Sequence, residues 1–211
     1  MRLNGERPKP LMEIAGRPIV WHVMSIYARQ GFDEFVLLTG HRGKEIADWA
    51  EGAEWAVECV DTGDETPTGG RVHALRDRLT ERFCLTYADG VADIDLRALV
   101  ARHEEARALA TMTVVQPELP FGVAHLDGER VTGFAEKPVS GQWVNGGFFV
   151  LEPGALAYLR ADSVLEREPL ERLAADGALA AYRHTGFWRC LDTAKDAAAL
   201  EQAGPGRWLP I

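Results

Sequence analysis

Residues 83–90 read FCLTYADG, an apolar run that ends in an aspartate between two small residues. A short run of this kind, without alternation, is typical of a strand buried on both faces of a parallel sheet. Open α/β sheets bind their ligands beyond the carboxyl ends of the strands, which is where Asp89 stands. A carboxylate there can bind a hard cation such as Mg²⁺. The alternative is an aspartate that caps a helix or closes a turn.

Comparable apolar runs lie on both sides of this stretch and alternate with segments of helical periodicity. Strands are expected at 35–38, 55–60, 83–87 and 111–115, and helices at 18–30, 43–49, 72–79 and 96–107. The alternation predicts an α/β fold, with a Rossmann-like, mostly parallel (mixed) sheet and helices on both faces.

The pattern changes after residue 115. A hairpin is expected around Asp127 and Gly128, from strands 123–126 and 131–134. Further strands are expected at 146–151 and 179–182, and helices at 153–159, 166–175 and 193–202. Because no linker, repeat or low-complexity tail interrupts the chain, we predict a single domain over residues 1–211.

The composition excludes several classes of protein. Of the 211 residues 46% are hydrophobic and 26% charged, which is ordinary for a globular protein. A net charge of −9 argues against a nucleic-acid partner. No apolar stretch approaches the ~20 residues of a membrane span, and no basic-then-apolar segment suggests a secretory signal. Three cysteines without metal-type spacing are expected to be reduced core residues of a cytoplasmic protein.

Lysine is scarce and placed unusually. Only four of the 23 basic residues are lysines, and two of these, Lys9 and Lys137, precede a proline. Lysine offers phosphate a compact point charge, whereas arginine offers a planar fork. The two positions are therefore candidates for phosphate binding, with codon bias as the alternative explanation.

Two further polar segments lie where strands are expected to end. Residues 61–71, DTGDETPTGGR, combine glycines that allow close backbone approach with the hydroxyls of Thr66 and Thr68; a solvated surface loop is the alternative. Asp192 follows the aromatic segment 186–188, and capping of the last helix is its default role. His22, on an apolar helix face, is expected to be a satisfied core residue.

Other catalytic signatures are absent from the sequence. No histidine or cysteine spacing supports zinc, no Gly-x-Ser-x-Gly segment supports a serine hydrolase, and no Walker-type loop is present. Asp93-Ile-Asp95 is an Asp-x-Asp pair after an apolar strand, which leaves a metal-dependent glycosyltransferase as an alternative function.

Seven segments, taken together and in order, resemble the sugar-1-phosphate nucleotidyltransferases, and most of all the glucose-1-phosphate cytidylyltransferases among them. They are RPKPLMEIAGRPIVWHVM (7–24), VDTGDETPTGGR (60–71), FCLTYADGVADID (83–95), FAEKP (134–138), VNGGFFVL (144–151), EPLERLAADGAL (168–179) and HTGFWRCLDT (184–193). The resemblance extends from residue 7 onward over essentially the whole chain. It implies the nucleotide-diphospho-sugar transferase type of fold.

The resemblance also implies a reaction. An oxygen of a sugar 1-phosphate attacks the α-phosphate of CTP in line, expelling pyrophosphate and giving a CDP-sugar for deoxysugar or polysaccharide biosynthesis. Mg²⁺ is the implied cofactor, and a homo-oligomer is implied because the 61–71 loop can be supplied across a subunit interface. Positioning and charge neutralisation carry most of such a reaction.

Residue roles follow from the same resemblance. Asp89 and Asp192 are implied to hold Mg²⁺, and Lys9 to place a cation on the phosphates near the reacting centre. Lys137 is implied to hold the sugar phosphate and Glu136 the sugar hydroxyls. Asn145, Gly146 and Gly147 are implied to shape the sugar pocket, and Thr66 and Arg71 of the 61–71 loop to contact the nucleotide. Arg2 is a further implied substrate contact.

The chain departs from the family at three places. The family begins with an apolar strand and a glycine-rich loop that wraps the triphosphate, and here only Met1-Arg2-Leu3 corresponds to its end. Absence of that first central strand is expected to leave its neighbours unpaired, so we expect the natural chain to start upstream; a non-catalytic binding remnant is the alternative. The family carries a long insertion before its segment corresponding to residue 61, and this chain has almost none of it. Ala88 stands where the most similar members of the family have glycine.

Overall fold

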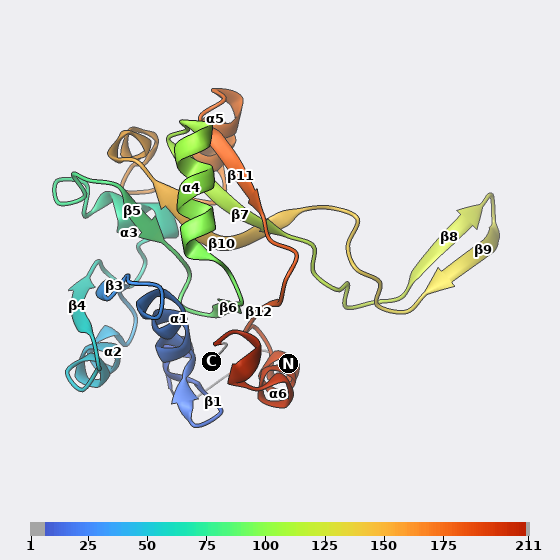
Figure 1. The fold of residues 1–211 in the computed structure, drawn as a ribbon, viewed down its shortest axis with the longest axis horizontal. Helices are drawn as coiled ribbons and strands as arrows, with labels where there is room; N and C mark the ends of the chain where they lie inside the picture. Colours follow the sequence, from blue (N-terminus) through green and yellow to red (C-terminus); the bar gives the residue numbers. More distant parts are fainter. Residues whose placement is uncertain (1–6, 210–211) are drawn as a thin grey trace.

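The computed structural model describes residues 7–209, and a four-stranded mixed sheet lies at its centre (Figure 1). The strand order is β11-β7-β10-β5. The bounds are β5 Phe83–Leu85, β7 Ala110–Val115, β10 Val144–Leu151 and β11 Leu179–Arg183. β11 runs parallel to β7, whereas β10 runs antiparallel to both β7 and β5. The strands were expected from their apolar runs, and six consecutive residues of β10 are buried.

A second, parallel pair of strands lies beside this sheet. β3 (Glu34–Thr39) pairs with β4 (Ala56–Asp61), and α2 (Gly43–Ala50) connects them. Within residues 7–209 no ladder joins β3 to β5. One apolar cluster nevertheless packs against both, because Leu38 of β3 and Leu85 of β5 contact a group of buried side chains that includes Leu165. The predicted mixed α/β fold is confirmed.

The main hydrophobic core forms around a short antiparallel ladder that the sequence patterns did not predict. β6 (Gly90–Ala92) pairs with β12 (Trp188–Cys190), and three residues are too few to show a periodicity. Around it pack α1 (Ile19–Ala28), α4 (Leu96–Ala106) and α6 (Ala194–Ala203). Tyr27 of α1 stacks on the fully buried Phe148, with ring centroids 5.9 Å apart.

Shorter elements complete the chain. They are the 3₁₀ helices η1 (Lys9–Leu11), η2 (Pro153–Tyr158) and η3 (Pro205–Arg207), strands β1 (Glu13–Ile14) and β2 (Arg17–Pro18), and helices α3 (Thr68–His73) and α5 (Glu168–Ala175). Three of these differ from expectation. The helix expected at 72–79 starts at Thr68, inside the segment expected to be a loop; 153–159 is 3₁₀ rather than α; and α5 begins two residues late, with Pro169 in its first turn, where proline is favoured.

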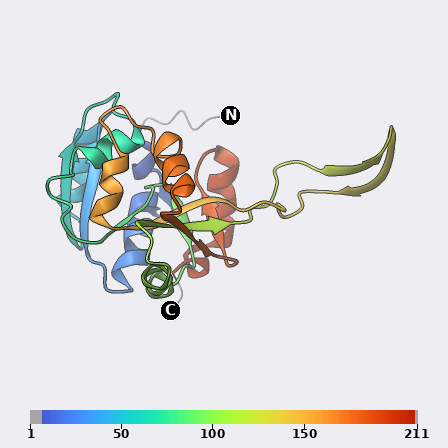
Figure 2. The same ribbon diagram turned by 90° about the horizontal axis from the view of Figure 1, so that it is seen from above.

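The expected hairpin forms a ribbon that projects away from the rest of the structure (Figures 1 and 2). It consists of β8 (Val123–Asp127) and β9 (Arg130–Ala135). A register shift places Leu126 opposite Val131 and Ala124 opposite Phe134, so all four share one face. The three large side chains of this face are 58–66% exposed.

Several single-residue expectations can be compared with the structure. His22 is buried, its Nε2 lies 2.7 Å from the Ile14 carbonyl oxygen, and its Nδ1 accepts from Trp208, so it is the satisfied core residue that was expected. The three cysteines are unpaired but only partly buried, at the edge of the core rather than inside it. Among the described residues no helix is long and apolar enough to cross a membrane.

Candidate active site

Three of the predicted site residues meet in one ionic cluster. Lys9 Nζ donates to Asp89 Oδ2 at 2.6 Å and to Asp192 Oδ1 at 2.7 Å. The three residues come from the beginning, middle and end of the chain. All three side chains are partly exposed, with 28% of the Asp89 side chain accessible. A ligand can therefore reach the cluster from solvent.

The β6–β12 ladder explains why the two aspartates are neighbours. Gly90 pairs with Cys190, and the Leu191 N–H donates to the Asp89 carbonyl oxygen at 2.8 Å, which extends the ladder by one bond. Asp89, just before β6, and Asp192, just after β12, therefore lie at the same end of the ladder. Lys9 reaches them from η1, which is fixed to the body by the buried Leu11.

Thr193, not Asp192, caps the last helix. The Thr193 hydroxyl accepts from the Asp196 N–H, and the Asp196 carboxylate accepts from the Thr193 N–H, which together form a capping box. The default expectation of a capping role for Asp192 is therefore wrong. Because the next residue satisfies the helix terminus, the Asp192 side chain is available to Lys9.

The cluster shifts the protonation equilibria of its members. Partial burial tends to lower the pKa of Lys9, but its hydrogen bonds to Asp192 and Asp89 outweigh this and raise it. The hydrogen bond from Lys9, followed by that from the Cys190 thiol, lowers the pKa of Asp192. Burial, together with Asp192, raises the pKa of Cys190 to about 12. At neutral pH the cluster therefore holds a charged lysine, a charged Asp192 and a neutral thiol.

The donor set suits a hard divalent cation. Two carboxylates already converge on a single cationic nitrogen, and Mg²⁺ is usually bound by one or two carboxylates together with substrate phosphates. Over residues 7–209 no group of three or more His, Cys, Asp or Glu side chains is placed to hold a metal ion. Asp89 and Asp192 therefore fit a metal whose other ligands come from water and substrate.

The predicted sugar-pocket residues lie in a bulge of β10. Its register against β7 shifts between Asn145 and Phe149, and Gly147 has a φ of +75°. The Asn145 side chain accepts from the Gly147 N–H at 2.9 Å and donates to the Tyr87 hydroxyl at 3.1 Å. The Gly146 carbonyl oxygen accepts from the Trp188 indole at 2.8 Å. The bulge is thus held in one conformation by polar contacts on both sides.

The 61–71 loop is held together by its own predicted contact residues. Arg71 Nη1 donates to the Thr39 carbonyl oxygen and to the Thr62 hydroxyl, both at 2.6 Å. The Thr66 hydroxyl donates to the Thr62 carbonyl oxygen. These bonds fix the loop at the carboxyl end of β3, beside which β4 ends. Arg71 and Thr66 are therefore loop-ordering residues in this structure.

Three predicted residues are not joined to the cluster. Glu136 and Lys137 follow β9 at the base of the ribbon, where Lys137 Nζ lies 3.6 Å from Glu136 Oε1. Neither has a hydrogen bond or ion pair to Lys9, Asp89 or Asp192 in the described structure. Arg2 lies outside the described residues.

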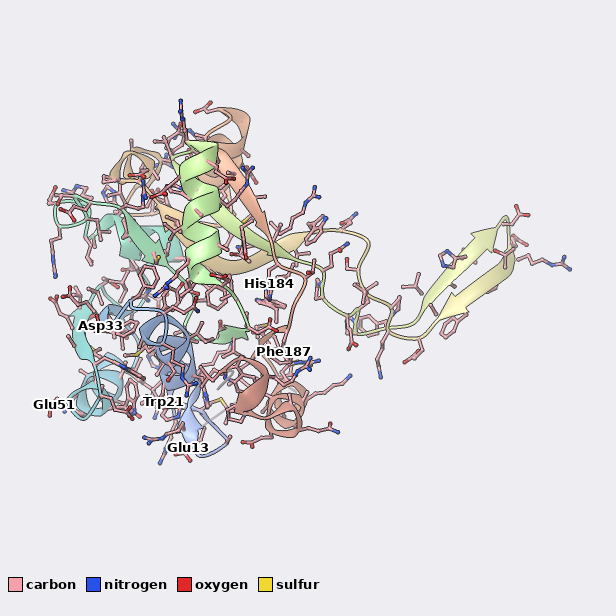
Figure 3. All side chains as sticks on the ribbon, in the orientation of Figure 1. Glu13, Trp21, Asp33, Glu51, His184 and Phe187 are labelled. Atoms are coloured by element: carbon pink, nitrogen blue, oxygen red, sulfur yellow. The ribbon has the colours of Figure 1, made fainter. Side chains whose placement is uncertain are left out.

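Asp93 and Asp95 have other partners. Asp95 is the N-cap of α4 and accepts from the Ala98 N–H at 2.9 Å, a role that aspartate commonly takes. Asp93 Oδ1 lies 3.0 Å from Nε2 of the nearly buried His184. Figure 3 labels His184 and Phe187, and the same Nε2 lies 3.1 Å from the Phe187 carbonyl oxygen. Asp95 therefore supports the start of α4, and Asp93 contacts the segment before β12; within residues 7–209 neither belongs to a group of three or more side chains placed to hold a metal ion.

Sequence reasoning did not identify Tyr87 and Glu166. The Tyr87 hydroxyl donates to Glu166 Oε1 at 2.7 Å, and the Thr68 hydroxyl donates to Glu166 Oε2 at the same distance. The available signal was that Tyr87 stands two residues before Asp89. Glu166 gave no such signal, because it follows an irregular segment far from the other candidates in sequence.

The profile of the nucleotidyl transferase family matches residues 2–189. A probable glucose-1-phosphate cytidylyltransferase of Bacillus subtilis is 38% identical, with 92% of this chain and 87% of the relative aligned. The glucose-1-phosphate cytidylyltransferase of Salmonella typhi is 36% identical, over 96% and 91% of the two chains.

Solved structures show the same fold at low sequence identity. HddC from Yersinia pseudotuberculosis superposes with a TM-score of 0.74 at 18% identity, covering 94% of this chain and 91% of the other. The inositol-1-phosphate CTP transferase from T. maritima superposes with a TM-score of 0.70 at 13% identity, covering 99% and 91%. These likenesses concern the fold alone.

Proposed function

Since this chain belongs to the nucleotidyl transferase family, we propose that it transfers a cytidylyl group from CTP to a hexose 1-phosphate, giving a CDP-sugar and pyrophosphate. Nucleotidyl transfer to a sugar 1-phosphate is the activity named for its curated bacterial relatives. Glucose 1-phosphate and CTP are the specific substrates proposed, because the names of both relatives described above specify glucose 1-phosphate and cytidylyl transfer. The reaction is proposed to take place in the cytoplasm.

The observation that carries the proposal is the contact of one lysine with two carboxylates. Transfer requires an oxygen of the sugar phosphate to attack the α-phosphate while the bond to the β-phosphate breaks and pyrophosphate leaves. Two polyanions must be brought together, so positioning and charge neutralisation dominate. Lys9 is charged at neutral pH and lies beside two carboxylates suited to a divalent cation, so the cluster can supply both positioning and charge neutralisation.

Each residue then has a defined task. Asp89 and Asp192 would hold Mg²⁺, which supplies charge neutralisation and a template for the phosphates. Lys9 donates hydrogen bonds to the phosphates, and its short 3₁₀ helix limits its freedom to move. Asn145, Gly146 and Gly147 present polar backbone and amide groups toward a sugar. Arg71 and Thr66 hold the 61–71 loop in the shape that meets the nucleotide.

Lys137 and Glu136 are proposed to bind the sugar phosphate and the sugar hydroxyls. Both residues lie at the base of the ribbon, so the ribbon must be held in one orientation for them to contact the substrate. A two-stranded ribbon alone is marginally stable in water, and both of its edges are open. The proposed homo-oligomer supplies the missing support.

A second copy of the chain is the partner we propose for the ribbon. The exposed apolar face of the ribbon, formed by Leu126, Val131 and Phe134, is the surface that the second copy covers. The contact is isologous, so the same face is buried in both copies. Sedimentation of the wild-type chain is expected to show a self-associated species. Phe134→Asp should weaken it, because a charge is placed on the apolar face; a wild-type chain that stays monomeric contradicts the proposal.

Pyrophosphate release tests the proposed reaction directly. The chain is mixed with glucose 1-phosphate and Mg²⁺, and with CTP, UTP, ATP, GTP or dTTP in turn. Release confined to CTP, and abolished by a chelator, is expected. Release with another nucleotide would correct the base preference, whereas silence with all five would favour a chain that binds but does not turn over.

A further inference from the structure

Glu166 connects two parts of the proposed site that are far apart in sequence. Its Oε1 accepts from the Tyr87 hydroxyl and its Oε2 from the Thr68 hydroxyl, each at 2.7 Å. The Thr68 hydroxyl in turn accepts from the Leu165 N–H at 2.9 Å. Both oxygens of one carboxylate are therefore engaged, and hydrogen bonds to a charged acceptor are the stronger kind.

Tyr87 leads from Glu166 to the sugar pocket. Its hydroxyl accepts from the Asn145 amide, and the Asn145 oxygen accepts from the Gly147 N–H. The Tyr87 ring also lies against the Gly147 backbone, since a Cβ at Gly147 would come within 3.2 Å of it. Burial, reinforced by Glu166, raises the pKa of Tyr87, so the phenol keeps its proton and remains a donor.

Thr68 leads from Glu166 to the nucleotide loop. It is the first residue of α3, and Arg71 in the same helix holds the loop at Thr39 and Thr62. The segment before Glu166 is packed tightly on α3. The Gly70 N–H donates to the Ser163 carbonyl oxygen at 3.0 Å, and a Cβ at Gly70 would come within 2.1 Å of the Ala161 carbonyl oxygen. The 61–71 loop and the segment before Glu166 must therefore move together.

We propose that Glu166 is a positioning residue that holds the sugar pocket and the nucleotide loop in a fixed relation, so that both substrates bind to one preorganised site. This inference rests on the proposed function. Glu166 is itself exposed, and hydrogen bonds and charges at an exposed position contribute little to folding. Its two contacts therefore matter for where Tyr87 and Thr68 are placed.

The test compares Glu166→Gln with Glu171→Gln, a matched control on the exposed face of α5. Glutamine keeps the size but replaces one of the two acceptor oxygens by an NH₂ group that only donates, so the hydroxyl that donated to that oxygen loses its acceptor. We expect Glu166→Gln to raise the KM for glucose 1-phosphate and for CTP about tenfold, as for one lost hydrogen bond to a charged group. The kcat should stay within about threefold. The melting temperature should change by less than about 2 °C.

The Tyr87→Phe variant distinguishes a positioning role of Glu166 from a general loss of structure. If Glu166 acts through Tyr87, the double variant should raise the KM for glucose 1-phosphate no further than Tyr87→Phe alone. Unchanged KM values in Glu166→Gln, with an active wild type, would overturn this inference and leave the proposed function standing. A fall in apparent kcat that matches a loss of folded protein, without a rise in KM, would also overturn it. A wild-type chain without turnover would contradict the proposed function, and this inference with it.

Discussion

Lys9 Nζ lies 2.7 Å from Asp192 Oδ1, although 183 residues separate the two in the chain. The same ammonium lies 2.6 Å from Asp89 Oδ2. An ion pair between partly exposed groups contributes little to folding, because water screens it and the long side chain loses freedom. Under the proposed function, the contact instead prepares a local balance of charge into which phosphates and a cation can enter.

Lys9→Met should lower kcat/KM for nucleotidyl transfer by about 10²–10³, because a preorganised cation at the phosphates is lost. Lys44→Met is the matched control. Lys44 also pairs with an aspartate, Asp48, but does so on the exposed surface of α2. Both variants are assayed by pyrophosphate release with glucose 1-phosphate and CTP. Equal activity of the two would show that Lys9 has no role in the reaction.

Asp89→Ala should reduce Mg²⁺-dependent activity by at least about 10², since one of the two carboxylates suited to the metal is removed. Asp95→Ala should leave activity nearly unchanged while lowering the free energy of unfolding by about 1 kcal/mol, the usual effect of losing an N-cap. Activity at several Mg²⁺ concentrations and urea unfolding measure the two effects. The reverse pattern would favour the glycosyltransferase alternative.

The pH dependence of stability follows from the lowered pKa of Asp192. Lys9, and then Cys190, hold this pKa below its unfolded value of about 3.9. The ionised carboxylate therefore adds stability above that value, and the contribution is lost as the pH falls through the folded-state pKa. Urea unfolding between pH 6 and pH 2.5 should show a smaller acid-induced loss for Asp192→Asn than for the wild type. Parallel curves would mean that the shift has no consequence for folding.

Gly147→Ala should destabilise the protein by about 1–2 kcal/mol, because an L-residue is strained in the left-handed region. The new Cβ would also press on the Tyr87 ring at 3.2 Å, so the KM for glucose 1-phosphate should rise. Gly141→Ala is the control, since it has no positive φ and a Cβ there meets nothing within 4 Å. Thermal unfolding and steady-state kinetics of the two variants check both effects.

The strands were predictable because their signal is local. β3 and β10 contain the apolar runs 35–38 and 148–151, β7 combines Ala, Met and Val with β-branched Thr, and the glycine between two charged residues at the tip of the ribbon indicates a turn. The β6–β12 ladder was not predictable. Its strands have three residues each, and their pairing depends on residues about a hundred positions apart. The division of the chain into a single domain stays a prediction.

The sequence by itself determined the fold class, the family and the identity of Lys9, Asp89 and Asp192 as candidates, because apolar periodicity and motif order are written in neighbouring residues. Only the tertiary structure decided which of them meet. It brought Lys9 to the two aspartates, left Glu136 and Lys137 on the ribbon, gave the helix cap to Thr193, and added Glu166. Contacts of this kind depend on how separate elements pack, and no local pattern records them.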